Sequence, residues 1–290
     1  MKSINDTYTL SNGLEIPCLG FGTYNPTGGD NVEIILTAME CGYRYFDTAS
    51  LYGTERALGE AVKKSGIARG DLFIASKAWI DEMGYEEVKQ AFERTLNRLQ
   101  TDYLDLYLIH WPRSAEDDTD WKEKGRETWR AMEELYEAGK IKGLGLSNFL
   151  PHHMDNILQN CKVKPVADQL ELHPGYMQQA ATAFCAENQV AVQAWSPLGR
   201  AKLLEDSLLL KMAAKYGKSP AQICLRYLLQ KGMIPLVKAT KAERMKQNAD
   251  VFDFEIEKDD MWMLDCMPQT AWSGEHPDFA IPKVKSNFEQ

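Results

Sequence analysis

The chain has 290 residues, of which 44% are hydrophobic and 26% charged, values typical of a globular protein with a full-sized core. Its formal net charge of −9 argues against nucleic acid or an anionic membrane surface as a partner, but leaves room for a local basic pocket. The N-terminus carries no apolar leader, and no apolar run is long enough to span a bilayer. We therefore expect a cytoplasmic protein that acts on a small molecule.

The six cysteines are widely spaced and mostly lie in apolar stretches, at positions 18, 41, 161, 185, 224 and 266. None belongs to a CxxC pair, and none has zinc-site spacing to a histidine. Buried, reduced thiols are therefore expected, and no metal site is predicted.

In chain order, a short hairpin comes first, because Asn12-Gly13 between 8–10 and 14–16 suits a tight turn with positive φ angles. Eight apolar runs suited to buried strands follow, at 19–22, 43–48, 72–77, 103–110, 141–147, 165–172, 190–196 and 233–238. Between and after these runs, apolar residues recur with helical spacing at 31–41, 54–65, 86–99, 126–138, 151–160, 177–188, 219–230 and 241–248.

Eight strands that alternate with eight helices predict a single α/β domain over 1–290, a (β/α)₈ TIM barrel with an N-terminal β-hairpin. The surplus residues are the segment 112–125, an extra helix at 203–216 and the tail 259–290. The alternative is an open doubly wound sheet, which normally carries a glycine fingerprint after its first strand. Gly20-Phe21-Gly22 lacks the third glycine of that fingerprint.

Titratable side chains are predicted at the carboxyl ends of three consecutive strands, where this barrel places its chemistry. Asp47 and Tyr52 follow the second strand, Lys77 ends the third, and His110 ends the fourth. Taken singly, each could be a rim residue, a core histidine or half of a structural ion pair.

Together the four residues suit general acid catalysis. A tyrosine pKa of about 10 is high for proton transfer near neutrality, and the ammonium of Lys77 is expected to lower it. Asp47 would keep Lys77 charged, and a neutral His110 would donate a hydrogen bond to a substrate carbonyl. No nucleophile with its own base accompanies this acid, so a hydride from a reduced nicotinamide is the expected attacking group.

Eight sequence fragments resemble those of the aldo-keto reductase superfamily in the same order and spacing over nearly the whole chain. They are GFGTY at 20–24, DTASLYGTE at 47–55, SKAW at 76–79, LIHWP at 108–112, GLGLSNF at 143–149, QLELHPGYMQ at 169–178, AWSPLG at 194–199 and VKATKAERMKQN at 237–248. The ending around WSGEHPDF resembles the microbial branch, with 2,5-diketogluconate reductase- and methylglyoxal reductase-like members.

This resemblance implies an NAD(P)H-dependent oxidoreductase, commonly a monomer, that reduces aldehydes and ketones. It implies that Tyr52 is the proton donor, that Lys77 and Asp47 tune it, and that His110 orients the substrate. The implied cofactor residues are Gly22, Thr23, Asp47, Ser147, Asn148, Gln169, Trp195, Ser196, Leu198, Lys238, Ala239, Thr240, Arg244, Gln247 and Asn248. The implied substrate residues are Tyr24, Trp79, His110 and Trp111.

The adenosine end of the implied cofactor site predicts NADPH. Lys238 and Arg244 would make charge-assisted bonds to a 2′-phosphate, which NADH lacks. Ala239 stands where the family usually has a serine, so some use of NADH is expected unless Thr240 replaces that bond. Trp195 stands where the family usually has a tyrosine stacked on the nicotinamide.

Two other functions stay open. One is a regulatory NADPH-binding module with weak catalysis, and the other is a metal-dependent hydrolase on the same fold. The hydrolase would need a cluster of histidine and aspartate ligands at the strand ends, where only His110 and His173 are available. The remaining histidines, His152, His153 and His276, are expected on the surface.

Overall fold

The fold is a closed barrel of eight parallel strands, seen in a computed structural model that describes residues 1–25, 31–282 and 284. The strands follow one another around the barrel in the order β10-β3-β4-β5-β6-β7-β8-β9. Their bounds are β3 (Gly20–Gly22), β4 (Tyr45–Asp47), β5 (Phe73–Ala78), β6 (Leu106–Ile109), β7 (Leu144–Ser147), β8 (Ala167–Glu171), β9 (Ala191–Trp195) and β10 (Ile234–Val237). The (β/α)₈ barrel predicted from the sequence is thus confirmed.

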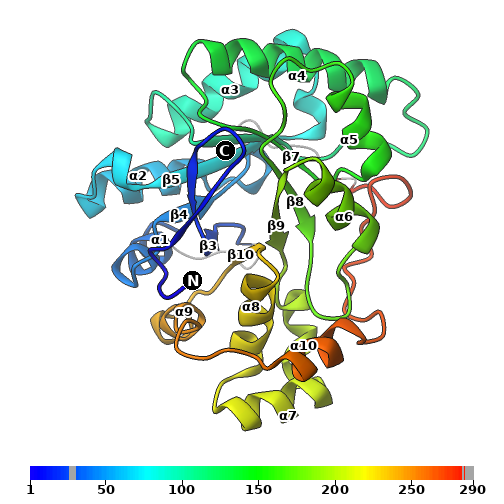
Figure 1. Cartoon of the computed structure of the whole chain (residues 1–290). Coiled ribbons are helices and arrows are strands. Elements are labelled where there is room, and N and C mark those ends of the chain that lie inside the picture. Colours follow the sequence, from blue (N-terminus) through cyan, green and yellow to red (C-terminus); the bar gives the residue numbers. More distant parts are fainter. Residues whose placement is uncertain (26–30, 283, 285–290) are drawn as a thin grey trace.

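Helices surround this barrel (Figure 1). They are α1 (Asn31–Glu40), α2 (Glu55–Ser65), α3 (Tyr85–Leu99), α4 (Trp121–Glu137), α5 (Pro151–Leu158), α6 (Gln179–Glu187), α7 (Ser207–Tyr216), α8 (Pro220–Gln230), α9 (Ala242–Ala249) and α10 (Lys258–Asp265). Four short 3-10 turns lie between them, η1 (Ser50–Tyr52), η2 (Arg69–Asp71), η3 (Ile80–Glu82) and η4 (Gly199–Glu205).

Three helices depart from the sequence prediction. α7 begins at Ser207 instead of 203, because residues 199–205 form η4 and Asp206 caps the helix. α4 begins at Trp121 instead of 126, because the Asp120 carbonyl accepts the first helical bond from Lys124 and Trp121 packs against His153 of α5. The tail contains α10, which is anchored to α7 by bonds from Lys215 and Tyr216 to Asp260. Tertiary contacts of this kind are invisible to a local periodicity argument.

The predicted hairpin closes the amino end of the barrel. β1 (Thr7–Thr9) pairs antiparallel with β2 (Glu15–Pro17), and Gly13 turns between them with φ +83°. Leu10 and Ile16 are buried in the same apolar cluster as the inward residues Tyr45 and Leu106. With this end plugged, the carboxyl end remains for a site.

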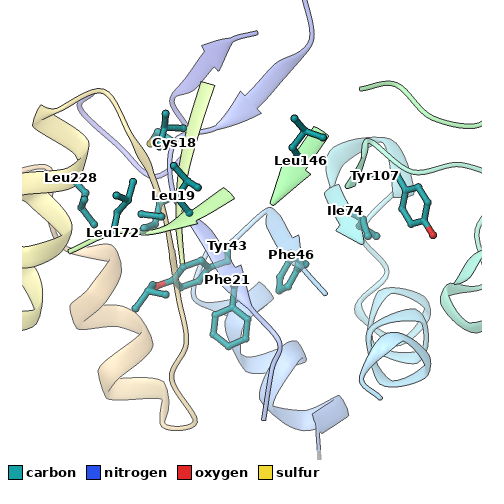
Figure 2. Close-up of a cluster of buried hydrophobic side chains, with 14 of the residues drawn as sticks. Cys18, Leu19, Phe21, Tyr43, Phe46, Ile74, Tyr107, Leu146, Leu172 and Leu228 are labelled. Carbon is teal, nitrogen blue, oxygen red and sulfur yellow. The ribbon is translucent and has the colours of Figure 1, made fainter. Parts of the chain in front are cut away.

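Side chains along each strand point alternately into the barrel and out toward the helices. In β4, Tyr45 belongs to the inner cluster and Phe46 to the outer one, so Asp47 points inward again. Figure 2 shows part of the outer layer, including Phe21, Phe46 and Ile74. Burial on both faces explains why the strands read as continuous apolar runs.

The six cysteines are free thiols, as expected from their spacing, but Cys41 and Cys161 are only partly buried and Cys266 is exposed, which corrects the expectation of burial for these three. In the part of the chain that the structure describes, no helix combines the length and apolar character needed to cross a membrane.

A glycine at position 20 is required by the tight interior of the barrel. A Cβ on Gly20 would lie 2.4 Å from Leu236 Cδ2 and 2.7 Å from Tyr45 Cδ1. We expect Gly20→Ala to lower the free energy of unfolding by about 1–3 kcal/mol through overpacking, measured by urea denaturation. Gly22→Ala in the same strand is the control, because no atom lies within 4 Å of its added Cβ. Equal stability of the two variants would contradict this account.

Candidate active site

Three of the predicted catalytic groups meet around a buried ammonium at the carboxyl end of the barrel. Lys77 Nζ lies 2.6 Å from Asp47 Oδ1, 3.0 Å from the Thr48 carbonyl and 3.4 Å from Tyr52 Oη. Each proton of the ammonium therefore has an acceptor, as a fully buried cation requires. β4 and β5 are neighbours in the barrel, which places Asp47 beside Lys77.

His110 completes the group from the end of β6. Its Nε2 lies 3.5 Å from Tyr52 Oη, and its ring packs edge-on against the ring of Trp79 at 4.8 Å. Burial lowers the pKa of His110 well below its ordinary value of 6.5, and the charge of Lys77 acts in the same direction. His110 is therefore neutral near pH 7, as expected.

The pKa of Tyr52 runs against the sequence expectation. Burial raises the pKa of its hydroxyl well above 10, and the Asp47 carboxylate adds to this. Burial also lowers the pKa of Lys77, although Asp47 opposes that change. In the free protein Lys77 thus contacts Tyr52 without bringing its pKa down, so Tyr52 is a neutral hydroxyl.

The turn that carries Tyr52 is held by a buried carboxylate that the sequence reasoning missed. Glu82 accepts hydrogen bonds from Ser50 Oγ at 2.5 Å and from the Trp79 amide at 2.9 Å. It also pairs with Arg94 at 3.2 Å. Because Ser50 begins η1 and Tyr52 ends it, Glu82 fixes that turn against the end of β5.

Thr23 lies at the same rim and is hydrogen-bonded to residues 47 and 54, further along the chain. Its hydroxyl contacts that of Thr54 at 2.8 Å, and its amide donates to the Asp47 carbonyl at 2.9 Å. Gly22 ends β3 directly before it and faces open space.

The residues expected to hold a nicotinamide amide form one hydrogen-bonded group. Asn148 Nδ2 donates to the His110 carbonyl at 3.0 Å and to Ser147 Oγ at 3.2 Å, while its Oδ1 accepts from Trp195 Nε1 at 2.9 Å. Asn148 has φ +61°, a left-handed backbone conformation that asparagine tolerates better than most residues. Gln169 joins this group to the predicted catalytic residues, because its Nε2 donates to Asp47 Oδ2 at 2.9 Å.

The other expected cofactor residues lie after β9 and β10. Ser196 and Leu198 follow Trp195, with Ser196 at φ +48° and Leu198 directly before η4. Lys238 follows β10 and donates to Asn25 Oδ1 at 2.8 Å, next to β3. Ala239 is buried and Thr240 exposed; on α9, Arg244 and Gln247 are exposed and Asn248 is buried. No described contact joins Lys238 to α9.

The aromatic residues expected to form the substrate pocket are only partly open. Tyr24 is 51% exposed and its ring lies 5.0 Å from that of Tyr52. Trp79 and Trp111 are 1% and 3% exposed, so little of either ring is open to solvent, and their place in a substrate pocket stays a prediction. Trp79 is covered by the tail, since its Nε1 donates to the Val284 carbonyl at 2.8 Å.

The C-terminal tail crosses this rim and is tied to it at several points. Glu171, at the end of β8, accepts bonds from the Ser273 amide at 2.9 Å and hydroxyl at 2.6 Å. Arg200 Nη2 pairs with Glu275 at 2.6 Å, and its guanidinium lies 5.8 Å from the Trp195 ring. Figure 1 shows the tail turning up beside α6 after α10.

One group of potential metal ligands occurs among the described residues, His152, His153 and Asp278. His153 Nδ1 accepts from the Leu150 amide, so in the neutral ring Nε2 carries the proton and donates to Asp278 at 3.0 Å. Arg113 also pairs with Asp278. These contacts suit an anchor for the tail better than a metal site. His153 is fully buried, which corrects its expected surface position.

Comparison with known proteins identifies the family. The family model for the Aldo/keto reductase family matches residues 18–267. A glyoxal reductase from Bacillus subtilis is 42% identical over 277 residues, covering 95% of this chain and 98% of that protein.

Two solved structures agree in fold and sequence. An aldo/keto reductase from Brucella melitensis has a TM-score of 0.84 and 41% identity, covering 89% of this chain and 97% of its own. A Bombyx mori aldo-keto reductase in complex with NADP has a TM-score of 0.82 and 32% identity, covering 89% and 91%. The barrel, the motifs and these likenesses together show that the chain belongs to the aldo/keto reductase family of oxidoreductases.

Proposed function

We propose that this chain reduces aldehydes and ketones to alcohols with NADPH, and that Tyr52 supplies the proton. The observation that carries the proposal is the position of the Tyr52 hydroxyl, 3.4 Å from Lys77 Nζ and 3.5 Å from His110 Nε2 at the carboxyl end of the barrel. From the family resemblance we also propose a monomer of the cytoplasm that acts on small molecules.

The residues around Tyr52 suit a nicotinamide cofactor. Among the described residues, Asn148 Oδ1 accepts a hydrogen bond from Trp195 alone, so it keeps a lone pair for an incoming amide. The Trp195 ring offers an apolar face beside it. When bound, NADPH would supply the hydride for the carbonyl carbon.

His110 would bind the substrate carbonyl, and Tyr52 would transfer a proton to it. His110 Nε2 is the ring nitrogen that faces Tyr52, so it can donate to the same carbonyl oxygen that Tyr52 protonates. Tyr52 Oη would pass its proton to that oxygen, which would complete the alcohol and leave Tyr52 as a phenolate. Lys77 would then donate a hydrogen bond to the Tyr52 phenolate. A nearby ammonium stabilises a tyrosine side chain most in this charged state.

Small carbonyl compounds are the proposed substrates, including dicarbonyls such as the one named for the Bacillus subtilis relative. The tail and the burial of Trp79 and Trp111 support a narrow approach to Tyr52. A hydrolase that uses His110 as a metal ligand is disfavoured, because the Nε2 of this histidine faces the Tyr52 hydroxyl.

The proton donor is tested with Tyr52→Phe. We expect this variant to bind NADPH like the wild type but to reduce methylglyoxal, an aromatic aldehyde and a diketo sugar acid about 10²–10⁴-fold more slowly. The assay is the loss of NADPH absorbance, with fluorescence titration for binding. Tyr107→Phe is the matched control, since the Tyr107 hydroxyl is buried without a partner among the described residues. If the wild type binds NADPH and reduces no carbonyl, the regulatory-module reading replaces this proposal.

The cofactor preference is tested with Arg244→Ala on α9. Removing one charge-assisted bond to a 2′-phosphate should raise KM for NADPH about tenfold and leave KM for NADH unchanged. Lys246→Ala, on the same helix and equally exposed, should change neither value. A wild type that prefers NADH, or an Arg244 variant that loses both cofactors equally, would refute the 2′-phosphate contact.

The pH dependence follows from the two shifted groups. His110 has a lowered pKa and so stays neutral as the pH falls through 6.5, while Tyr52 has a raised pKa and keeps its proton as the pH rises through 9. We therefore expect kcat/KM for a neutral aldehyde, at saturating NADPH, to be flat from about pH 6 to about pH 9. A loss of activity with an apparent pKa near 8 would instead favour a Tyr52 pKa lowered by Lys77.

A further inference from the structure

A chain of buried polar side chains continues from the catalytic residues into the barrel interior. Asp47 Oδ1 accepts from Lys77, and its Oδ2 accepts from Gln169 Nε2 at 2.9 Å. The same Nε2 donates to Gln193 Oε1 at 3.0 Å, and Tyr45 Oη donates to that oxygen from across the barrel, also at 3.0 Å. All five side chains are nearly or fully buried and come from four strands.

These bonds determine which end of the Gln169 amide faces the site. Both protons of Nε2 are used, one on Asp47 and one on Gln193. Oε1 accepts no described hydrogen bond, yet it is not among the buried atoms without a partner, so it retains access to solvent. Gln169 therefore offers a carbonyl oxygen, which accepts from an amide N–H₂ group.

The hydrogen bonds that Gln193 makes leave one of its own polar groups buried and unpaired, which lowers stability. Its Oε1 serves two donors, while its Nε2 is buried with no partner among the described residues. A buried unsatisfied N–H₂ is unfavourable, and an apolar side chain of similar length would avoid it. Stability alone does not account for glutamine here, whereas a need for its acceptor oxygen does.

We propose that Gln193 is a positioning residue, which anchors Gln169 so that Gln169 Oε1 binds the carboxamide of the nicotinamide. This inference rests on the proposed cofactor. Gln193 also holds the proton of Tyr45, which keeps that hydroxyl from competing for Asp47. A bare structural cross-link between β4, β8 and β9 is the other explanation of the same contacts, and it predicts no effect specific to the nicotinamide half of the cofactor.

The test separates the two halves of the cofactor. We measure Kd by fluorescence titration for NADPH and for adenosine 2′,5′-bisphosphate, which lacks the nicotinamide. Gln193→Met should raise Kd for NADPH roughly tenfold, the value of one lost hydrogen bond, and leave Kd for the bisphosphate unchanged. Tyr45→Phe should act in the same direction and more weakly, and it keeps the proposal testable if Gln193→Met fails to fold.

Two comparisons show whether Gln193 acts through Gln169. In a Gln169→Ala background, Gln193→Met should have no further effect on NADPH binding, because the group it positions is gone. Tyr107→Phe, which removes a buried hydroxyl without a partner, should leave both Kd values unchanged. Equal weakening of both ligands, or additive effects with Gln169→Ala, would overturn the inference. A wild type that binds the bisphosphate but not NADPH would instead overturn the proposed cofactor.

Discussion

The site depends on one buried ammonium ion. Taking a lysine side chain out of water costs several kcal/mol unless each N–H finds an acceptor. Lys77 meets this demand with Asp47, the Thr48 carbonyl and Tyr52, which come from a single stretch that runs from the last residue of β4 to the end of η1. The need to satisfy this cation therefore fixes the strand end, the following turn and the tyrosine relative to β5. Removing the Asp47 carboxylate would leave the ammonium buried without a counter-charge, so the geometry of these groups and the stability of this rim depend on the same ion pair.

Other buried polar groups hold the residues around this ion pair in place through further hydrogen bonds. The second oxygen of Asp47 is held by Gln169, and Glu82 holds the turn that bears Tyr52. Each of these partners sits on a strand or an adjacent short turn and is fixed by its own hydrogen bonds. A reacting geometry needs to be held within about 0.5 Å, which loosely packed side chains do not achieve.

The position of a residue at the carboxyl end of a strand explains why so much of this could be predicted from the sequence. Asp47, Lys77 and His110 end or directly follow three consecutive strands, and the carboxyl ends of parallel neighbours in a barrel meet at one rim. The start of α4, the burial of Trp79 under the tail and the burial of His153 depend on contacts between distant segments, such as Trp79 with Val284. The pKa of Tyr52 was predicted in the wrong direction for a related reason. Lys77 was visible as a neighbour, but the burial that outweighs it is a sum over the whole rim.

That raised pKa bears on the direction of the reaction. Reduction of a carbonyl begins with a protonated tyrosine, and a hydroxyl that holds its proton at every physiological pH is always ready for it. Oxidation of an alcohol would need Tyr52 as a phenolate before the hydride leaves, and burial beside Asp47 makes that state costly in the free protein. On the proposed mechanism, the phenolate would become favourable only while charge develops on the substrate oxygen, when Lys77 would stabilise it. Such a site would stabilise the transition state more than the ground state, which is the condition for catalysis. Because both directions share that transition state, the raised pKa would decide which protonation state of Tyr52 is ready at neutral pH and would leave the equilibrium of the reaction unchanged.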